Sequence, residues 1–443
     1  MSNKVTTTDM NNDDKSSLTP KLRFPEFRCA GVWKTETLGS VASISTEKVG
    51  DEDCIPMSIT TGVGLVSQIE KFGRIIAGNS YKNYLLLKQY DFAYNKSATK
   101  EFPEGYIALY SGDELAAVPN SIFTCLRIKG KSLDPQYLNY LFLANLHGKW
   151  LRKFIEVGGR AHGSLSINED DLLALPVPLP MGESSLAEQQ KIADCLTSLD
   201  AVIAAQSQKL DALKSYKKGL LQQLFPREGE KVPRVRFREF QSAPAWEMHP
   251  LDSFVIKTFY GTSQSTSSKG RYPVLRMGNM VDGGLDLSNL AYIDLDPESF
   301  ESFRLTKGDI LLNRTNSPAL VGKVSLFQLE SEYMTASYIV TYRLDKDRMD
   351  PAFCNYILNT PLYQGRIKAL AKPSISQVNI NPTAFRKELI IAVPSAAEQN
   401  HIAACLCSVD EMLNSESDKL KFLKIHKKGL MQQLFPCVER VEP

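Results

Sequence analysis

Apolar residues recur in two stretches of the chain at spacings that alternate between four and three. The first stretch runs from Ile192 to Leu224 and the second from Ile402 to Leu434. This spacing averages about 3.5 residues and persists for about five heptads, which is typical of long helices that pack in a coiled coil. Each stretch ends in Leu-Phe-Pro, and proline cannot continue a helix. We therefore predict long helices over residues 187–226 and 397–436.

The two stretches are copies of one another. Residues 187–226 and 397–436 align without gaps at an offset of 210, and 23 of these 40 positions are identical. The similarity continues more weakly outside them: KLRFPEF at 21–27 matches RVRFREF at 234–240, and each is followed by a tryptophan. The chain is therefore an internal repeat. We expect the two helices to pack antiparallel and to relate the halves by a pseudo-twofold axis.

The segments that precede the two helices, residues 37–180 and 250–394, have diverged and have a mixed pattern. Apolar residues alternate at 106–111 and 337–344, as in strands. The runs 134–155 and 350–370 have helical spacing, and each begins with Asp-Pro, a good helix start. Leu138, Leu141 and Phe142 are expected to face a core. These patterns predict a mixed α/β fold of two globular domains separated by two long antiparallel coiled-coil helices.

The predicted division of the chain has six parts. They are a disordered tail at 1–19, a globular domain at 20–186, a spacer helix at 187–226, a second globular domain at 227–396, a second spacer helix at 397–436 and a tail at 437–443.

Composition restricts the class of protein. The 52 basic residues nearly balance the 50 acidic ones, so any affinity for nucleic acid must come from local patches or be shared with partners. The eight cysteines show no metal or disulfide framework, which favours reduced thiols. No apolar run reaches the ~18 residues that span a membrane, and the first 17 residues lack the apolar core of a secretory signal. We expect a cytoplasmic protein that binds no metal.

Catalytic motifs are missing from the sequence. The run Asn381-Pro382-Thr383 lacks the second proline and the aromatic residue of an amino-methyltransferase loop. A phosphate-binding loop that ends at Ser132 would need glycine where Cys125 stands. The five histidines are scattered without ligand spacing. The sequence therefore predicts a chain that is not itself an enzyme.

Two polar loops are the first candidates for contact with nucleic-acid bases. GGRAHGSLSIN at 158–168 and AKPSISQVNIN at 371–381 each lie between a helix and a strand-like run. They differ between the halves while their flanks agree, as expected if each half reads a different sequence. An ordinary turn with satisfied polar groups is the alternative. The candidate DNA contacts are Arg160, His162 and Ser164 in the first loop and Ser374, Ser376 and Gln377 in the second.

A second candidate strip follows a predicted strand in each half. Asn95 and Lys96 stand opposite Asn313 and Arg314 in the repeat. A lysine or arginine there suits a phosphate or a guanine, and a capped strand end is the alternative.

Lysines near the ends of the long helices are candidate subunit contacts. Lys217 and Lys218 recur as Lys427 and Lys428. Contact with a partner subunit or with DNA phosphate is one interpretation, and a solvated helix face near a favourable helix dipole is the other.

Taken together, these features resemble the specificity subunits of type I restriction–modification systems. The resemblance covers residues 20–436. Its carriers are the alternation of two variable globules with two alike helices, the A-E-Q start of each helix, the ends KKGLLQQLFP and KKGLMQQLFP, and R-F-x-E-F followed by tryptophan. It implies that each globule is a target recognition domain for one half of a split, asymmetric site in double-stranded DNA. The helices would form the spacer that docks two methyltransferase and two restriction subunits.

The resemblance also implies a division of labour. The assembled complex would methylate adenine with S-adenosylmethionine and cleave unmodified DNA with ATP and Mg, as in defence against phage. Those cofactors would bind the partner subunits and not this chain. The alternatives are a recognition arm of another defence or modification complex, a coiled-coil scaffold with no role on DNA, and an enzyme in its own right.

Overall fold

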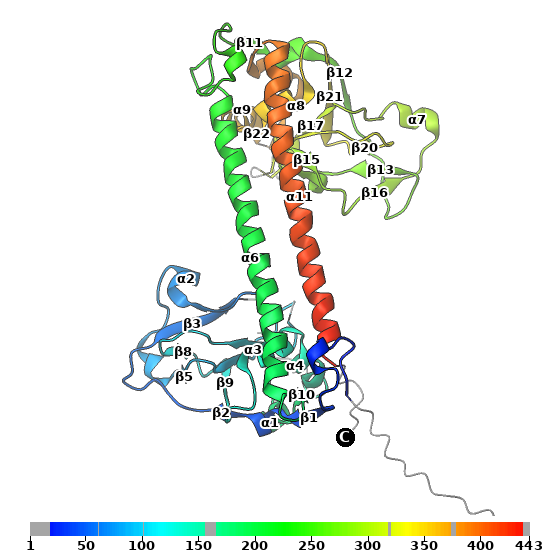
Figure 1. The fold of residues 1–443 in the computed structure, drawn as a ribbon. Helices are drawn as coiled ribbons and strands as arrows, with labels where there is room; N and C mark the ends of the chain where they lie inside the picture. The colour runs from blue at the N-terminus through cyan, green and yellow to red at the C-terminus, as the bar shows by residue number, and fades with distance from the viewer. Residues whose placement is uncertain are drawn as a thin grey trace, which may run out of the picture. The chain divides into compact units, whose positions relative to one another are not determined.

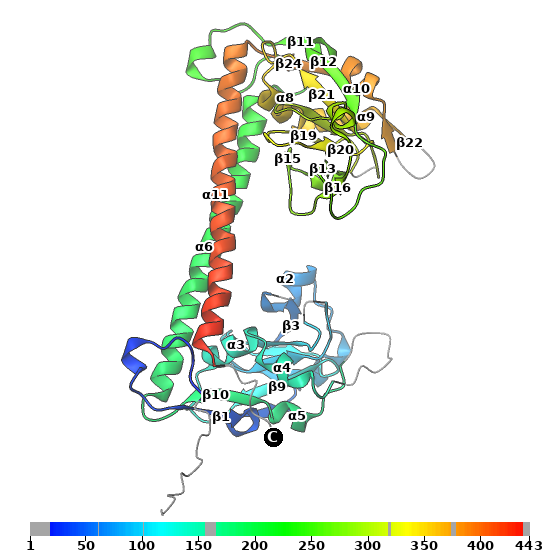
Figure 2. The ribbon, with the colours of Figure 1, turned by 90° about the vertical axis from the view of Figure 1, so that its right-hand side faces the viewer.

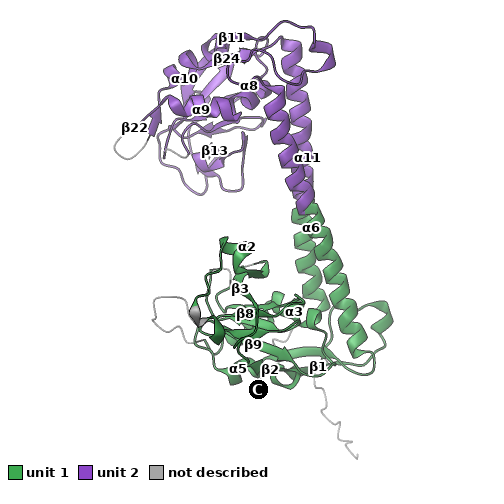
Figure 3. Cartoon of the chain, turned by 90° about the vertical axis from the view of Figure 1, so that its left-hand side faces the viewer, with its two compact units in different colours: residues 1–206, 419–443 green, residues 207–418 purple. Residues whose placement is uncertain are grey.

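The computed structural model describes residues 18–60, 62–100, 102–155, 165–317, 320–373 and 378–436. The chain divides into two compact units, which Figure 3 colours separately. The first unit consists of residues 1–206 and 419–443, and the second of residues 207–418. Each unit holds one mixed α/β globule together with a part of both long helices, so the predicted mixed α/β class with two domains is confirmed.

The long helices are α6 (Ser185–Leu224) and α11 (Ala396–Leu434). Both stop at the leucine of Leu-Phe-Pro, two residues before the predicted ends. Figures 1 and 2 show them side by side in each unit. In the first unit, the beginning of α6 packs with the end of α11 in one hydrophobic core. In the second unit, the end of α6 packs with the beginning of α11. The two helices therefore run antiparallel within each unit.

The first globule contains two four-stranded sheets and one two-stranded pair. Their strand orders are β2-β9-β6-β7, β4-β3-β8-β5 and β1-β10. The strands are β1 (Trp33–Thr37), β2 (Ala42–Ser45), β3 (Ile55–Thr60), β4 (Gly64–Ser67), β5 (Leu85–Leu87), β6 (Phe92–Asn95), β7 (Tyr106–Leu109), β8 (Ala116–Val118), β9 (Phe123–Ile128) and β10 (Pro176–Pro180). The helices are α1 (Leu38–Val41), α2 (Gln68–Phe72), α3 (Pro135–Leu143), α4 (Leu146–Leu151) and α5 (Glu169–Leu173), with 3-10 turns η1 (Pro25–Phe27) and η2 (Asn79–Asn83).

One core ties this globule to the long helices. It joins Phe92 and Leu126 of the sheet, the predicted core residues of α3, Ile192 of α6 and Leu434 of α11. Leu138, Leu141 and Phe142 are buried as predicted. The globule is thus seated on both long helices.

The second globule has a four-stranded sheet of order β12-β21-β17-β19 and three-stranded sheets of order β16-β13-β20 and β18-β23-β22. The strands are β11 (Glu247–Pro250), β12 (Val255–Tyr260), β13 (Tyr272–Leu275), β14 (Met280–Val281), β15 (Gly284–Leu285), β16 (Ala291–Ile293), β17 (Ile310–Asn313), β18 (Thr315–Asn316), β19 (Val324–Leu326), β20 (Met334–Thr335), β21 (Ile339–Leu344), β22 (Ala371–Pro373), β23 (Val378–Ile380) and β24 (Ile390–Val393). The helices are α7 (Pro297–Glu301), α8 (Pro351–Leu358), α9 (Pro361–Ala369) and α10 (Pro382–Glu388), with 3-10 turns η3 (Arg238–Phe240), η4 (Leu251–Phe254) and η5 (Met277–Asn279).

Each predicted Asp-Pro helix start is present. The Asp134 carboxylate accepts a hydrogen bond from the backbone N–H of Tyr137 at 2.8 Å, and Asp350 does the same for Phe353 at 2.7 Å. Each caps the free N–H groups of the first helical turn.

The runs 134–155 and 350–370, which have helical spacing, each form two helices. In the first globule Asn145 adopts a left-handed backbone conformation, with φ of 62°, between α3 and α4. In the second globule Thr360 is extended because Pro361 follows it, and its side chain caps the new helix α9. Helical spacing of apolar residues continues across both breaks, so periodicity alone does not reveal them.

Acidification is expected to destabilise the first unit through His147. This buried imidazole packs edge-on against Tyr94 and Phe142, and burial lowers its pKa from 6.5 to about 4. Between pH 6.5 and about 4 the unfolded chain binds a proton that the folded chain does not. Stability is therefore lost as the pH falls through this window, by about 1.4 kcal/mol per pH unit. Urea unfolding at several pH values should show this contribution, and His147→Phe should reduce the slope by this amount. An unchanged slope in the variant would refute the assignment to His147.

Candidate nucleic-acid interface

The A-E-Q motif at the start of α6 anchors the first globule. The Glu188 carboxylate is 1% exposed and accepts hydrogen bonds from Nε and Nη2 of Arg23, both at 2.7 Å, and from Nε1 of Trp33 at 3.3 Å. The bond to Glu188 raises the pKa of Arg23. Arg23 belongs to the R-F-x-E-F segment, so the two motifs meet in one buried ion pair.

The same anchor recurs in the second unit. Glu398 of α11, also 1% exposed, accepts from Nε of Arg236 at 2.7 Å, from its Nη2 at 2.6 Å and from Nε1 of Trp246 at 3.2 Å. The guanidinium of Arg236 also donates to the carbonyl oxygens of Ala243 and Pro244. The residues that are alike in the two halves therefore join each globule to a long helix.

The glutamine of each A-E-Q motif forms hydrogen bonds with the segment just before a helix of the globule, α3 in the first unit and α8 in the second. Gln189 accepts from the N–H of Asp134 at 2.9 Å and donates to the carbonyl of Ser132 at 3.1 Å. Gln399 accepts from the N–H of Asp350 at 2.9 Å and donates to the carbonyl of Arg348 at 3.3 Å. Both glutamines are buried.

Lys427 is engaged inside the first unit. Its ammonium lies 2.6 Å from Asp200 of α6 and 5.1 Å from the ring centroid of Tyr140, whose hydroxyl donates to Asp200 at 2.8 Å. Burial raises the pKa of Tyr140. The three residues tie α6, α11 and the globule together.

Lys217 has the same role in the second unit. It pairs with Asp410 of α11 at 2.6 Å and lies 5.4 Å from the ring of Tyr356, which donates to Asp410 at 2.6 Å. Both ammonium groups are paired within the chain, and the subunit contacts predicted for Lys217 and Lys427 stay predictions. Lys218 and Lys428 are exposed, and a partner contact through them stays a prediction.

Lys217→Ala is expected to lower the free energy of unfolding of the second unit by about 1–3 kcal/mol, since it removes a half-buried charged hydrogen bond. Hydrogen exchange of the α6 and α11 amides during denaturation would locate the loss. Lys218→Ala, one residue away and exposed, is the control and should change stability by no more than about 0.5 kcal/mol. Equal effects of the two variants would contradict the role given to Lys217.

A buried aspartate precedes the second candidate strip in each globule, four residues before Asn95 and Asn313. Asp91 pairs with Arg127 at 2.7 Å, and Asp309 pairs with Arg343 at 2.8 Å. Both carboxylates also accept a backbone N–H from the turn before the strand, at 2.8 Å. These shared residues fix the turn and the neighbouring strand of the sheet.

The four residues of this strip differ in how deeply they are buried. Asn95 is half-buried at the end of β6, and its side chain accepts from the N–H of Ser97 at 3.0 Å. Asn313 is fully buried with its amide directed toward the carbonyl of Leu320, so this structure favours the strand-end alternative for it and gives it no surface for DNA. Lys96 and Arg314 are half-buried, and the guanidinium of Arg314 lies 5.4 Å from the ring of Tyr260. DNA contact through Asn95, Lys96 and Arg314 stays a prediction.

The candidate residues of the two polar loops lie outside the described residues. They are Arg160, His162, Ser164, Ser374, Ser376 and Gln377.

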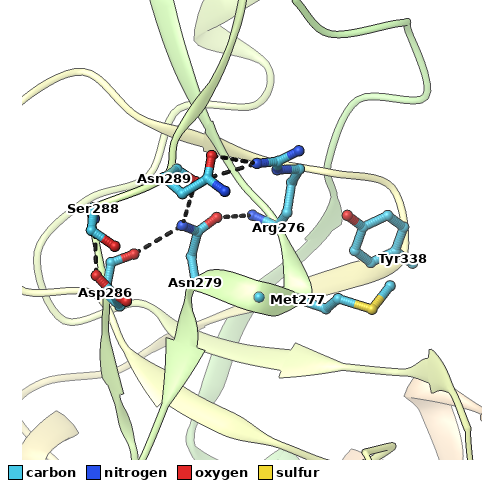
Figure 4. A pocket seen from close by; sticks show the side chains of 8 residues that line it. Arg276, Met277, Asn279, Asp286, Ser288, Asn289 and Tyr338 are labelled. Carbon is cyan, nitrogen blue, oxygen red and sulfur yellow. Dashed lines mark hydrogen bonds between the residues drawn. The ribbon is translucent and has the colours of Figure 1, made fainter. Parts of the chain in front are cut away.

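A polar pocket in the second globule was not predicted from the sequence (Figure 4). It encloses about 360 Å³, and its lining includes Arg276, Met277, Asn279, Asp286, Asn289 and Tyr338. These residues come from three separate segments, so no spacing in the sequence signals the pocket. Among the described residues, no group of three His, Cys, Asp or Glu side chains could hold a metal ion, and no helix there is long and apolar enough to cross a membrane.

The family model of the type I restriction modification DNA specificity domain matches the chain twice, over residues 33–215 and 246–424. The two matches together cover most of the chain, so the chain belongs to this family. Each match takes in one globule and most of the long helix that follows it in the sequence.

Known proteins agree with this assignment. The chain is 29% identical over 193 residues to a protein of Methanocaldococcus jannaschii named as the MjaX specificity subunit, which is 43% of this chain and 45% of that protein. The MjaVIII specificity subunit of the same organism is 22% identical over 329 residues, 73% of this chain and 74% of that protein. The alignment with the first relative thus spans less than half of its length. The crystal structure of the S subunit of a type I restriction–modification system from M. genitalium has the same fold, with a TM-score of 0.58 and 14% identity over 95% of this chain and all of that one.

Proposed function

We propose that this chain is the specificity subunit of a type I restriction–modification complex and that each unit reads one half of a bipartite DNA site. The observation that carries the proposal is the duplication of one anchor around two different globules. Three groups of residues in the first unit recur in the second with the same residue types. They are the cluster of Arg23, Glu188 and Trp33, the hydrogen-bonded Gln189, and the cluster of Tyr140, Asp200 and Lys427. Two globules that are anchored in the same way but differ in sequence suit two different half-sites.

The long helices are proposed to form an antiparallel coiled-coil spacer, with the units related by a pseudo-twofold axis. The alternation of apolar residues by four and three supports the coiled coil. The ion pairs support the symmetry, because Asp200 with Lys427 and Asp410 with Lys217 exchange places at the repeat offset of 210.

The partners are proposed to be two methyltransferase subunits, docked on the long helices, and two restriction subunits. Large apolar side chains are exposed on these helices, as expected of a surface that another protein covers. Phe422 is 66% exposed and Ile425 61% in the first unit, and Tyr216 is 56% exposed in the second. In this proposal the partner subunits bind S-adenosylmethionine, ATP and Mg, and this chain supplies recognition alone.

The test is methylation mapping of the native genome with and without this gene. The proposal predicts one two-part motif that is methylated in the parent strain, unmethylated in the deletion strain and restored by the gene on a plasmid. The proposal would be refuted if every methylated two-part motif persisted in the deletion strain, or if no methylated motif depended on the gene.

A further inference from the structure

The polar pocket of the second globule has the chemistry of a base-reading site. Arg276 precedes η5, Asp286 and Asn289 belong to the loop between β15 and β16, and Tyr338 precedes β21. Figure 4 shows their side chains gathered around one hollow. Arg276 and Asn289 can donate hydrogen bonds, Asp286 and Asn289 can accept them, and Tyr338 supplies an aromatic wall.

The two loops that form most of the pocket are joined by hydrogen bonds of Asn279. The amide of Asn279, which is buried, accepts from the backbone N–H of Arg276 at 2.8 Å. It donates to the carbonyls of Asp286 at 2.8 Å and Asn289 at 3.1 Å. Asn279 therefore holds the two loops together without using Nε or Nη1 of Arg276.

The guanidinium of Arg276 is oriented by hydrogen bonds that use only part of its N–H donors. Its Nη2 donates to Asn289, at 3.2 Å to the backbone oxygen and 3.4 Å to the side-chain oxygen. Within the described ranges its Nε and Nη1 have no acceptor. A half-buried arginine fixed at one edge presents its remaining donors in a plane, the arrangement that recognises the O6 and N7 acceptors of guanine.

The negative charge of Asp286 in the lining of the same pocket argues against a phosphate ligand. Asp286 accepts from the N–H of Ser288 at 2.9 Å, and hydrogen bonds from Ser288 lower the pKa of this carboxyl group. An ionised carboxylate repels phosphate and accepts a hydrogen bond from the N4 amino group of cytosine. A donor and an acceptor of these kinds together match the edge of a guanine–cytosine pair.

The pocket adjoins the sheet that continues into the second polar loop. The side-chain amide of Asn316 in β18 contacts the sulfur of Met277 at 2.9 Å. The neighbouring Thr315 donates to Asn379 of β23 at 2.6 Å, and β18 pairs with β23. The pocket therefore adjoins a sheet whose strands β22 and β23 flank the candidate residues of the second polar loop in the sequence.

We propose that Arg276 reads a guanine in the half-site recognised by the second unit, with Asp286 facing the paired cytosine. This inference rests on the proposed function. An arginine–guanine contact of this kind discriminates against the wrong base by about 10- to 100-fold.

The experiment compares Arg276→Ala with the parent chain, each co-expressed with its methyltransferase partner in a host that lacks both genes, by genome-wide methylation mapping. The expected result is the same motif with one guanine position of the second half-site relaxed and the first half-site unchanged. Arg271→Ala is the control: Arg271 lies on the approach to β13 and against the ring of Tyr272, at 4.9 Å, and does not line the pocket. This control should leave the motif intact.

The outcomes are distinguishable. A parent chain that gives no two-part motif overturns the proposed function and this inference together. A two-part motif that keeps every base in Arg276→Ala overturns the inference alone. If the variant methylates no site, the purified methyltransferase complex is tested by competition binding with duplexes that vary each base of the parent motif. Loss of discrimination at one guanine supports the inference, and an equal loss of affinity for all duplexes overturns it.

Discussion

Glu398→Gln is expected to cost the second unit about 3–5 kcal/mol of stability, because it leaves the charge of Arg236 buried without its partner. The guanidinium side chain is 8% exposed, so water cannot replace the lost carboxylate. Glu188→Gln should have the same effect on the first unit through Arg23. Denaturation followed by hydrogen exchange separates the two, since each variant should destabilise its own unit.

Two controls make this prediction specific. Glu247→Gln removes an exposed carboxylate that pairs with His249, and it should cause no measurable change. The double variant Arg236→Met/Glu398→Leu removes both buried charges and should recover part of the stability lost by Glu398→Gln. If the single and double variants were equally destabilised, the uncompensated charge would not be the cause.

A half-chain of residues 1–226 is expected to form a homodimer in which each copy completes the first unit of the other. In the first unit, α11 supplies Lys427 to Asp200, and Phe435, directly after α11, packs against Tyr137 at a ring distance of 5.6 Å. The repeat places Lys217 of α6, and Phe225 directly after α6, at the equivalent positions. The end of α6 from a second copy can therefore occupy the place of α11.

Light scattering coupled to size-exclusion chromatography would measure the mass of the half-chain. The variant Leu224→Asp places a charge where α6 should enter the partner's core, and it should remain monomeric. With the methyltransferase partner, the dimer is expected to direct methylation to a site built from two inverted copies of the first half-site. A folded half-chain that stays monomeric at concentrations where the full chain is stable would contradict the internal symmetry.

The long helices and the helix starts could be predicted because local chemistry determines them. The four-and-three spacing and the Leu-Phe-Pro ends place α6 and α11 to within two residues, and Asp134 and Asp350 cap helices as Asp-Pro indicates. The repeat also points to the residues of the anchors, since identical residues in divergent surroundings have a shared structural role.

The features that the sequence did not reveal depend on contacts between distant segments. Lys217 and Lys427 look like surface residues until α6 and α11 are paired, and only then does each meet an aspartate and a tyrosine. Asn313 looks accessible until β17 is buried between its neighbours. The pocket around Arg276 needs three segments, two of which are joined by the buried amide of Asn279.

The most direct test of two-part recognition is the exchange of one globule. Residues 37–180 would be replaced by the equivalent region of a related chain that has a different motif. The anchors Arg23, Trp33 and Glu188 lie outside the exchanged segment and are retained. Methylated-site sequencing should then show a motif with one half-site changed to that of the donor chain and the other half-site unchanged. A hybrid in which both half-sites change, or in which neither changes, would contradict the assignment of one half-site to each globule.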